Sequence, residues 1–192
     1  RAAMLTTGAR HAEFRNLHRP GVDLPTSDLY VTFLRDLPDH PDKCLEMIPR
    51  KSRASTRHAR DKHGMELFEE RAALDEFYEL FVQNKRALGS PVFSRSYFQS
   101  LLERFGERVL LHVVRCEGQV IAACVSFVHG GVLNPYYSGS VPGTERLGSM
   151  NFLYWRLMEE GVKKGGTKFD FGRSRAGTGA CTFKINMGFE PT

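Results

Sequence analysis

The sequence predicts an α+β fold with a mainly antiparallel central sheet flanked by helices. Three β-rich runs, at 108–116, 119–128 and 132–137, are separated only by short turns with glycine, which is typical of an antiparallel meander. Segments with helical periodicity stand before and after these runs, instead of alternating with them one by one. With 192 residues, of which 41% are hydrophobic, the chain is long enough to bury a real core.

The first forty residues are expected to form a separate piece. Residues 13–17 and 29–34 have the composition of two strands joined by a turn-rich loop. Prolines and aspartates then favour a linker over 36–42. We therefore expect residues 1–40 to be the C-terminal remnant of a preceding domain and residues 41–192 to be the main domain.

The two ends of the chain suggest a piece of a longer protein. The first residue is Arg1 and not methionine, and the last residues stop where another strand can begin. We expect the main domain to be truncated at its last strand.

Four segments have the periodicity and the end signals of helices. Ser94 and Ser149 are predicted N-caps, and Gly64, Gly89 and Gly106 are predicted helix ends. The apolar positions define helices over 74–81, 97–105 and 150–158, and residues 44–63 favour a helix interrupted at Pro49. A short strand is predicted at 168–171.

The predicted helix at 44–63 carries the main basic feature of a chain whose net charge is +5. Its arginines are spaced so that they share one face, which predicts a surface for phosphate groups. The alternative is an ordinary solvated helix face. The candidate residues are Arg50, Lys51, Arg53 and Arg57, with Arg60 completing the stripe.

Common catalytic and metal motifs are missing. There is no GxSxG, HExxH or Walker motif, and Gly177-Thr178-Gly179 lacks the third glycine of a dinucleotide fingerprint. The four cysteines form no CxxC pair, which favours reduced thiols in a cytosol and predicts no metal site. No signal peptide or membrane-spanning run is evident, so we expect a cytoplasmic protein, with the inner face of the membrane as a site of peripheral contact.

Five short motifs follow one another in an order that resembles FemAB-type transferases of the acyl-CoA N-acyltransferase (GNAT-like) superfamily. The match is closest to the FemAB-related proteins associated with bacterial exosortase and exopolysaccharide systems. The motifs are Ile48-Pro49-Arg50-Lys51-Ser52-Arg53, Tyr136-Tyr137-Ser138-Gly139-Ser140, Met150-Asn151-Phe152-Leu153-Tyr154-Trp155, Phe169-Asp170-Phe171-Gly172-Arg173-Ser174, and Phe183-Lys184 with Gly188-Phe189-Glu190-Pro191.

The resemblance implies a GNAT-like fold and an N-acyl or aminoacyl transferase. It also implies an aminoacyl-tRNA donor, an amine acceptor on a peptidoglycan, envelope or exopolysaccharide precursor, and a twin of this domain before residue 41. No tightly bound cofactor is expected, because the donor is a co-substrate. The expected partners are an anionic small-molecule or lipid-linked precursor and tRNA, but not DNA.

The donor site departs from the pattern of CoA-dependent members. Those members have a Gln/Arg-x-x-Gly-x-Gly/Ala turn whose amides hold pyrophosphate. Here Arg146, Gly148 and Ser149 keep only Arg-x-Gly, although a helix that begins at Ser149 still attracts an anion. An acyl-CoA-dependent N-acetyltransferase is therefore the second reading, and a non-catalytic RNA- or anion-binding module on the same fold is the third.

Amide formation needs a group that takes a proton from the amine and donors that face the oxyanion. Asp170 is the candidate for the acceptor amine, with Arg173 and Ser174 as binding residues; a local Asp–Arg pair in a turn is the alternative. Tyr136 and Tyr137 are predicted on opposite faces of their strand, one in the core and one with its hydroxyl in a cleft as acid or oxyanion donor; core packing of both is the alternative.

The remaining candidates surround a glycine-rich loop. Gly177 and Gly179 offer amides to a phosphate, with the Lys184 ammonium as a catalytic group beside them. The alternative is a flexible connection and a solvated lysine. Asn151, one turn inside the helix after the donor turn, completes the predicted substrate site.

Overall fold

The structure is a computed structural model that describes residues 8–11, 13–14, 21, 25 and 27–192. Most of the predicted strand at 13–17 and of the loop after it lies outside the described residues. Within them, no helix is both long enough and apolar enough to cross a bilayer.

The described strands form one six-stranded mixed sheet in the order β1-β6-β5-β4-β3-β2. All neighbouring strands are antiparallel except β5 and β6, so the predicted α+β, mainly antiparallel fold is confirmed. The strands are β1 (Tyr30–Asp36), β2 (Glu66–Glu69), β3 (Val109–Cys116), β4 (Gln119–His129), β5 (Val132–Ser140) and β6 (Lys168–Arg175).

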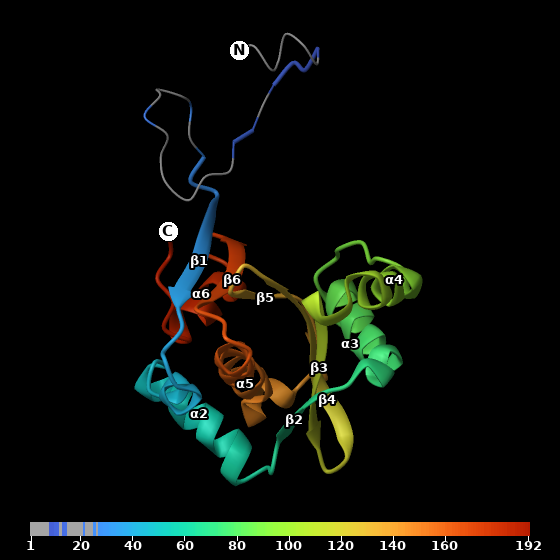
Figure 1. Cartoon of the computed structure of the whole chain (residues 1–192), viewed down its shortest axis with the longest axis vertical. Helices are drawn as coiled ribbons and strands as arrows, with labels where there is room; N and C mark the ends of the chain where they lie inside the picture. The colour runs from blue at the N-terminus through green and yellow to red at the C-terminus, as the bar shows by residue number, and fades with distance from the viewer. Residues whose placement is uncertain (1–7, 12, 15–20, 22–24, 26) are drawn as a thin grey trace.

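Helices cover both faces of the sheet, α3 and α4 on one side and α2 and α5 on the other (Figure 1). Each face has its own buried core, because alternate residues of a strand point to opposite sides. The helices are α2 (Arg50–Asp61), α3 (Leu74–Ala87), α4 (Arg95–Phe105), α5 (Ser149–Lys163) and α6 (Gly179–Asn186), with short 3₁₀ turns η1 (Pro41–Leu45), η2 (Arg71–Ala73), η3 (Gly106–Arg108) and η4 (Thr144–Leu147).

Several predicted helix signals are confirmed. The Ser94 side chain accepts the amide of Tyr97 at the start of α4, and Gly106 ends that helix with a φ of 54°. The predicted 44–63 helix is broken by Pro49, which lies at the N-cap of α2 with an extended ψ of 149°.

The prediction for Ser149 is wrong. Gly148, with a φ of 79°, occupies the N-cap of α5, and Ser149 is the first helical residue. Its hydroxyl donates to Thr144 Oγ1 at 3.0 Å, so the side chain supports the preceding 3₁₀ turn instead of capping the helix.

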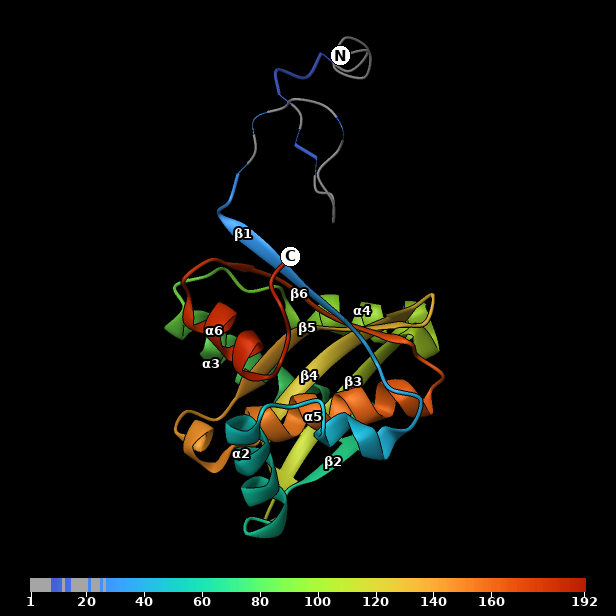
Figure 2. The same cartoon turned by 90° about the vertical axis from the view of Figure 1, so that its left-hand side faces the viewer.

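Strand β1 is an edge strand of this same sheet. It pairs with β6 from Tyr30–Arg175 to Asp36–Lys168, and Figure 2 shows the two strands side by side. The predicted boundary at residue 40 therefore falls between two parts of one folded unit. On the other edge of β1, the amide and carbonyl of Thr32 bond to Thr192, both at 2.9 Å.

Arg35 fastens β1 to both neighbouring segments. Its Nη1 donates to the carbonyl oxygens of Met47 and Gly188, each at 2.9 Å. One guanidinium thus links the edge strand, the segment before α2 and the turn after α6.

Candidate active site

Strands β5 and β6 separate soon after they begin to pair. Their parallel register covers only Val132–Lys168 and Leu133–Phe169. Just beyond, Asn134 Nδ2 donates to the Asp170 carbonyl at 2.9 Å, so a side chain takes over where the backbone ladder stops. The separation leaves the backbone of β6 free to bond with other groups.

A β-bulge shapes β6 at this point. Phe33 pairs with Gly172 and Leu34 with Asp170, so Phe171 is an extra residue on the bulged strand. Gly172 has a φ of 68°, which favours glycine, and its amide donates to Asp170 Oδ1 at 2.8 Å. The Asp170 carboxylate therefore holds the bulge, a role that neither the predicted contact with the acceptor amine nor the alternative local Asp–Arg pair describes.

The Lys184 ammonium lies on this bulge. Its Nζ donates to the carbonyls of Gly172 at 3.1 Å and Arg173 at 3.3 Å. It also lies 5.4 and 5.3 Å from the ring centroids of Phe33 and Phe171. Burial lowers the pKa of Lys184 to about 8, and the nearby Asp170 charge opposes this shift only in part.

Ser138 and Tyr154, which are not among the predicted site residues, connect this region to β5. The hydroxyls of Ser138 on β5 and Tyr154 on α5 are 3.0 Å apart, and the Tyr154 ring centroid lies 4.4 Å from that of Phe171. Burial raises the pKa of Tyr154, so its hydroxyl stays protonated. The helical periodicity of 150–158 does not indicate this polar contact, because its partner Ser138 lies on a strand.

The prediction for Tyr136 and Tyr137 is half right. Tyr137 is buried and Tyr136 is 64% exposed, but their ring centroids are only 4.8 Å apart and do not lie on opposite faces. A register shift places Val125 opposite Tyr137 and Ser126 opposite Pro135, which breaks the alternation at Tyr136.

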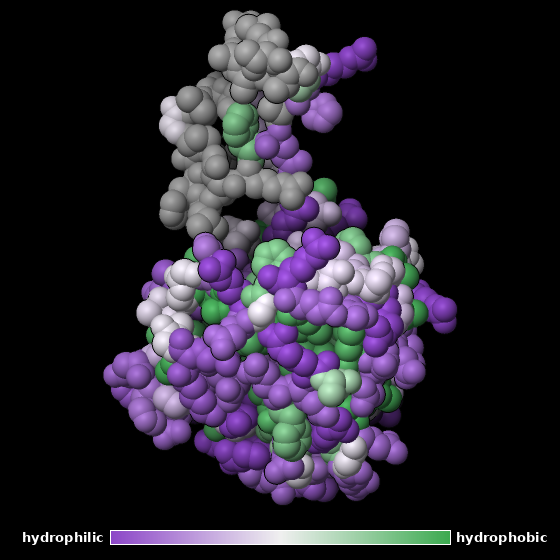
Figure 3. Space-filling model, turned by 45° about the vertical axis from the view of Figure 1, so that its right-hand side comes forward, coloured by the Kyte–Doolittle hydropathy of each residue, from purple (hydrophilic) through white to green (hydrophobic). Residues whose placement is uncertain are grey.

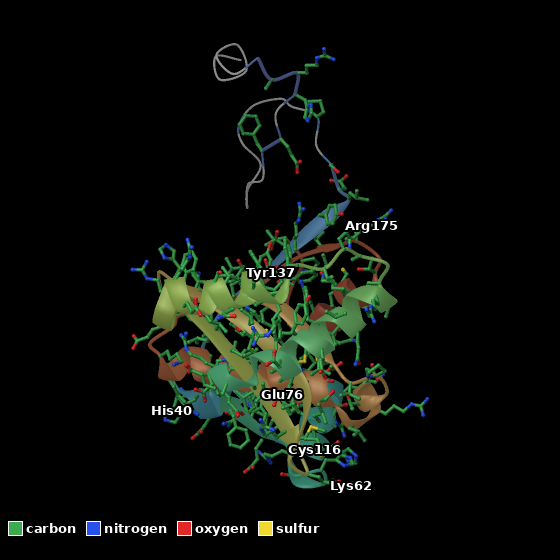
Figure 4. All side chains as sticks on the ribbon, turned by 90° about the vertical axis from the view of Figure 1, so that its right-hand side faces the viewer. His40, Lys62, Glu76, Cys116, Tyr137 and Arg175 are labelled. Atoms are coloured by element: carbon green, nitrogen blue, oxygen red, sulfur yellow. The ribbon has the colours of Figure 1, made fainter. Side chains whose placement is uncertain are left out.

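Tyr137 belongs to an aromatic cluster on the α3–α4 side. Its hydroxyl lies 2.9 Å from that of Tyr97, and its ring touches Phe81 and Phe98 edge-on. Figure 4 shows Tyr137 near the same end of the molecule as Arg175, the last residue of β6, while Cys116 and Lys62 lie at the opposite end. The structure thus places Asp170 and Lys184 on the same bulge, where both side chains bond to the backbone of Gly172, and gives Tyr137 a different set of partners.

The arginine stripe on α2 is not one continuous surface. Arg53 turns back to the carbonyls of Ile48 and Glu46, and Arg60 pairs with Asp61 while lying over the Trp155 ring. Arg50, Lys51 and Arg57 are exposed. Of the four predicted residues, three remain open to an anionic ligand.

The predicted donor turn is covered by α2. Gly148 and Ser149 are buried, and a Cβ at Gly148 would lie 2.6 Å from the Ser55 carbonyl oxygen. Only Arg146 is exposed. The predicted phosphate site at the start of α5 is therefore closed by the chain's own helix.

The other predicted binding residues lie in separate places. Arg173 is exposed, with its guanidinium 4.6 Å from the Tyr30 ring centroid, and Ser174 is buried. Asn151 Nδ2 bonds to Met187 Sδ at 3.3 Å, which is a packing contact between α5 and the end of α6. Gly177 and Gly179 are exposed beside Thr178, whose side chain caps α6.

A cavity of about 270 Å³ lies elsewhere, between α2, β2 and α5. Arg60, Trp155 and Arg156 line it, and apart from Arg60, which completes the basic stripe, none of the predicted site residues does. Across the described residues, no three His, Cys, Asp or Glu side chains gather as metal ligands, and the four cysteines are free thiols.

A family model described as acetyltransferase (GNAT) domain matches residues 49–184. The chain belongs to this family. The GNAT match runs from the N-cap of α2 to Lys184, so it contains the β5–β6 separation, the bulge and the lysine on it.

Solved structures agree with the GNAT fold. FemX, at 14% identity, has a TM-score of 0.74 over 84% of this chain and 59% of its own. The C-terminal domain of an Agrobacterium fabrum protein assigned as a lysylphosphatidylglycerol synthetase has 17% identity and a TM-score of 0.58, over 85% and 58%. The ribosomal-protein-S18-alanine N-acetyltransferase of Escherichia coli has 21% identity and a TM-score of 0.51, over 63% and 74%.

The GNAT chain described here spans less than two thirds of the first two of these structures. At such identities the likeness concerns the fold alone. None of the curated proteins matches the chain.

Proposed function

We propose that this chain carries the transfer site of an N-acyl or aminoacyl transferase that forms an amide on an amine of a cell-envelope or exopolysaccharide precursor. The observation that carries the proposal is the Lys184 ammonium, half-buried on the bulge where β5 and β6 separate. A cation held in partly desolvated surroundings is suited to stabilise negative charge that develops on a carbonyl oxygen.

The reaction follows from this placement. A neutral amine attacks the acyl carbonyl, a C–N bond forms, and negative charge gathers on the oxygen near Lys184. The ester C–O bond then breaks, the carbonyl is restored as an amide, and the proton lost by the amine goes to the leaving oxygen. The proposed Lys184 role is charge stabilisation and proton relay, in which the ammonium donates a proton to the leaving oxygen and recovers the proton that the amine loses, with Asp170 setting its position through the bulge.

Aminoacyl-tRNA is the proposed donor. The closed start of α5 supports this choice, because buried Gly148 and Ser149 give a CoA pyrophosphate no open helix N-terminus. The exposed Arg50, Lys51 and Arg57 are proposed contacts for tRNA phosphates or for an anionic, lipid-linked precursor. Such a reaction belongs in the cytoplasm, and the free cysteines are compatible with that location.

An acyl-CoA-dependent N-acetyltransferase is the second candidate, because the family is described as an acetyltransferase domain. A third, a non-catalytic RNA- or anion-binding module, is favoured only by the exposed basic residues of α2.

One experiment separates the three. The full-length protein is mixed with charged tRNA or with acyl-CoA, together with candidate amine precursors, and amide products are detected by mass spectrometry. Product from charged tRNA alone supports the proposal, and product from acyl-CoA selects the second candidate. Salt-sensitive RNA binding without turnover from either donor selects the third.

A further inference from the structure

The connection between α3 and α4 carries exposed apolar side chains. Leu88, Val92 and Phe93 are 65%, 44% and 49% exposed, and every residue from 86 to 96 is exposed. Figure 3, which brings this side of the molecule forward, shows hydrophobic residues among hydrophilic ones over the surface. Single exposed apolar residues are ordinary, but a group of them marks a contact surface.

These residues continue into the aromatic cluster of β5. Phe93 stacks on Tyr97 with centroids 4.7 Å apart and meets Tyr137 at 5.9 Å. Tyr136, 64% exposed, also contacts Tyr137, with ring centroids 4.8 Å apart. We call Leu88, Val92, Phe93 and Tyr136 the tip patch.

The segment that carries three of the four tip-patch residues contains basic residues and no acidic ones. No aspartate or glutamate occurs between Glu79 and Glu103, whereas this stretch contains Lys85, Arg86 and Arg95. Arg95 is compensated by Asp75 of α3. Lys85 and Arg86 stand in the last turn of α3, directly before Leu88, and the Lys85 ammonium extends over the Phe81 ring at 5.5 Å.

We propose that the tip patch is a membrane-contacting surface. Leu88, Val92 and Phe93 enter the interfacial layer of an anionic bilayer while the two cations meet its headgroups, a combination that supports reversible peripheral binding. The two cations before Leu88, Lys85 and Arg86, favour an anionic surface over a neutral one.

The position of the tip patch relates the membrane contact to the candidate site. Tyr136 lies on β5, the strand that separates from β6 beside Lys184. Bilayer contact at the tip patch therefore brings the candidate site to the membrane, where a lipid-linked acceptor is presented. This use rests on the proposed function, but the membrane contact does not.

Vesicle co-sedimentation of the full chain tests the contact. Vesicles of phosphatidylcholine with phosphatidylglycerol in equal parts should bind the protein, and pure phosphatidylcholine vesicles should bind it at least about tenfold more weakly. Leu88→Asp with Phe93→Asp should lower the binding about tenfold or more. Lys85→Gln with Arg86→Gln should lower it severalfold.

Matched controls use residues away from the patch. Phe105→Asp changes an equally exposed phenylalanine at the other end of α4, and Lys62→Gln removes an exposed lysine at the end of the molecule opposite Tyr137 (Figure 4). Both should bind as the wild type does. The proposal is overturned if wild type ignores anionic vesicles, if the controls lose as much binding as the tip variants, or if light scattering shows a dimer that Phe93→Asp dissociates. Transfer activity with a soluble acceptor is not affected by this outcome, so the two proposals fail separately.

Discussion

Lys184 Nζ lies 3.1 Å from the carbonyl oxygen of Gly172, across the bulge that the Asp170 carboxylate holds in place. The contact joins α6 to β6 and keeps an ammonium in half-buried surroundings where its pKa falls to about 8. A lysine that serves only solubility stays in water, where its charge costs nothing. This placement trades stability for a reactive cation.

Replacing Lys184 should therefore stabilise the fold. The pKa of Lys184 falls from 10.5 to about 8 on folding, so the cost of burying its charge is fully present below pH 8 and disappears as pH rises toward 10.5. We expect Lys184→Met to raise the free energy of unfolding at pH 7 by roughly 1–3 kcal/mol. Urea unfolding at pH 7 and pH 10 should show the gain shrinking at the higher pH. A variant less stable than wild type at both values would argue against a charged, desolvated lysine.

His112 should make the protein sensitive to mild acid. Its ring is fully buried on β3 and has no hydrogen-bond partner in the described part of the chain, and burial lowers its pKa from 6.5 to about 4. As the pH decreases, His112 takes up a proton in the unfolded chain before it does so in the folded chain. The free energy of unfolding should therefore fall between pH 6.5 and pH 4, by up to roughly 3 kcal/mol.

His112→Leu should remove much of this acid sensitivity and add roughly 1–3 kcal/mol at pH 7, because no buried imidazole nitrogen is left unsatisfied. Urea unfolding at pH 7 and pH 5 measures both effects. The exposed His129 provides the control, and His129→Gln should leave the pH dependence unchanged. An unchanged acid slope in His112→Leu would assign the sensitivity to other groups.

Gly188 should not tolerate a methyl group. It has a φ of 90°, and a Cβ there would lie 2.8 Å from the Met47 carbonyl oxygen and 2.9 Å from Arg35 Nη1. Gly188→Ala should cost about 3 kcal/mol or more, from backbone strain and from disruption of the Arg35 junction.

Substitution of Gly177 separates the cost of backbone strain from the cost of crowding around the added Cβ. Its φ is 75°, but a Cβ there meets nothing within 4 Å, so Gly177→Ala should cost only about 1–2 kcal/mol. Thermal unfolding of both variants gives the comparison. Equal losses of stability in the two variants would mean that the close contacts around Gly188 add nothing to the cost of the substitution.

The hydroxyls of Tyr97 and Tyr137 should be energetically coupled. They lie 2.9 Å apart within the aromatic cluster, and burial with the Tyr97 contact raises the pKa of Tyr137. Tyr137→Phe should cost about 1 kcal/mol, and a double-mutant cycle with Tyr97→Phe should give a coupling of about 0.5–1.5 kcal/mol. Strictly additive losses would show that the two hydroxyls bond to water instead.

The sequence predicted the elements whose signals are local. The meander β3–β5 and helices α3–α5 have clear periodicity or turns, and Ser94 and Gly106 mark real helix ends. Strand β2 was not predicted, because it has only four residues and mostly exposed side chains. Helix α6 was not predicted either, because its sequence GACTFKIN has no apolar stripe and starts with glycine.

The candidate site depends on features that a periodic pattern does not contain. The bulge at Phe171 and the register shift at Tyr136 each change which face a side chain occupies, so the two tyrosines could not be placed by alternation. The pairing of β1 with β6 joins residues far apart in the chain. Asp170 and Lys184 were selected through the family resemblance, and their proximity became visible only in three dimensions.

The most direct test of the central claim is the single-turnover rate of amide formation by full-length Lys184→Met with the active donor and acceptor. Loss of the ammonium should lower this rate about 10²–10³-fold, by the loss of oxyanion stabilisation, while Lys43→Met, an exposed lysine on η1, keeps the wild-type rate. A Lys184→Met enzyme that is folded and transfers at the wild-type rate would contradict the proposed site.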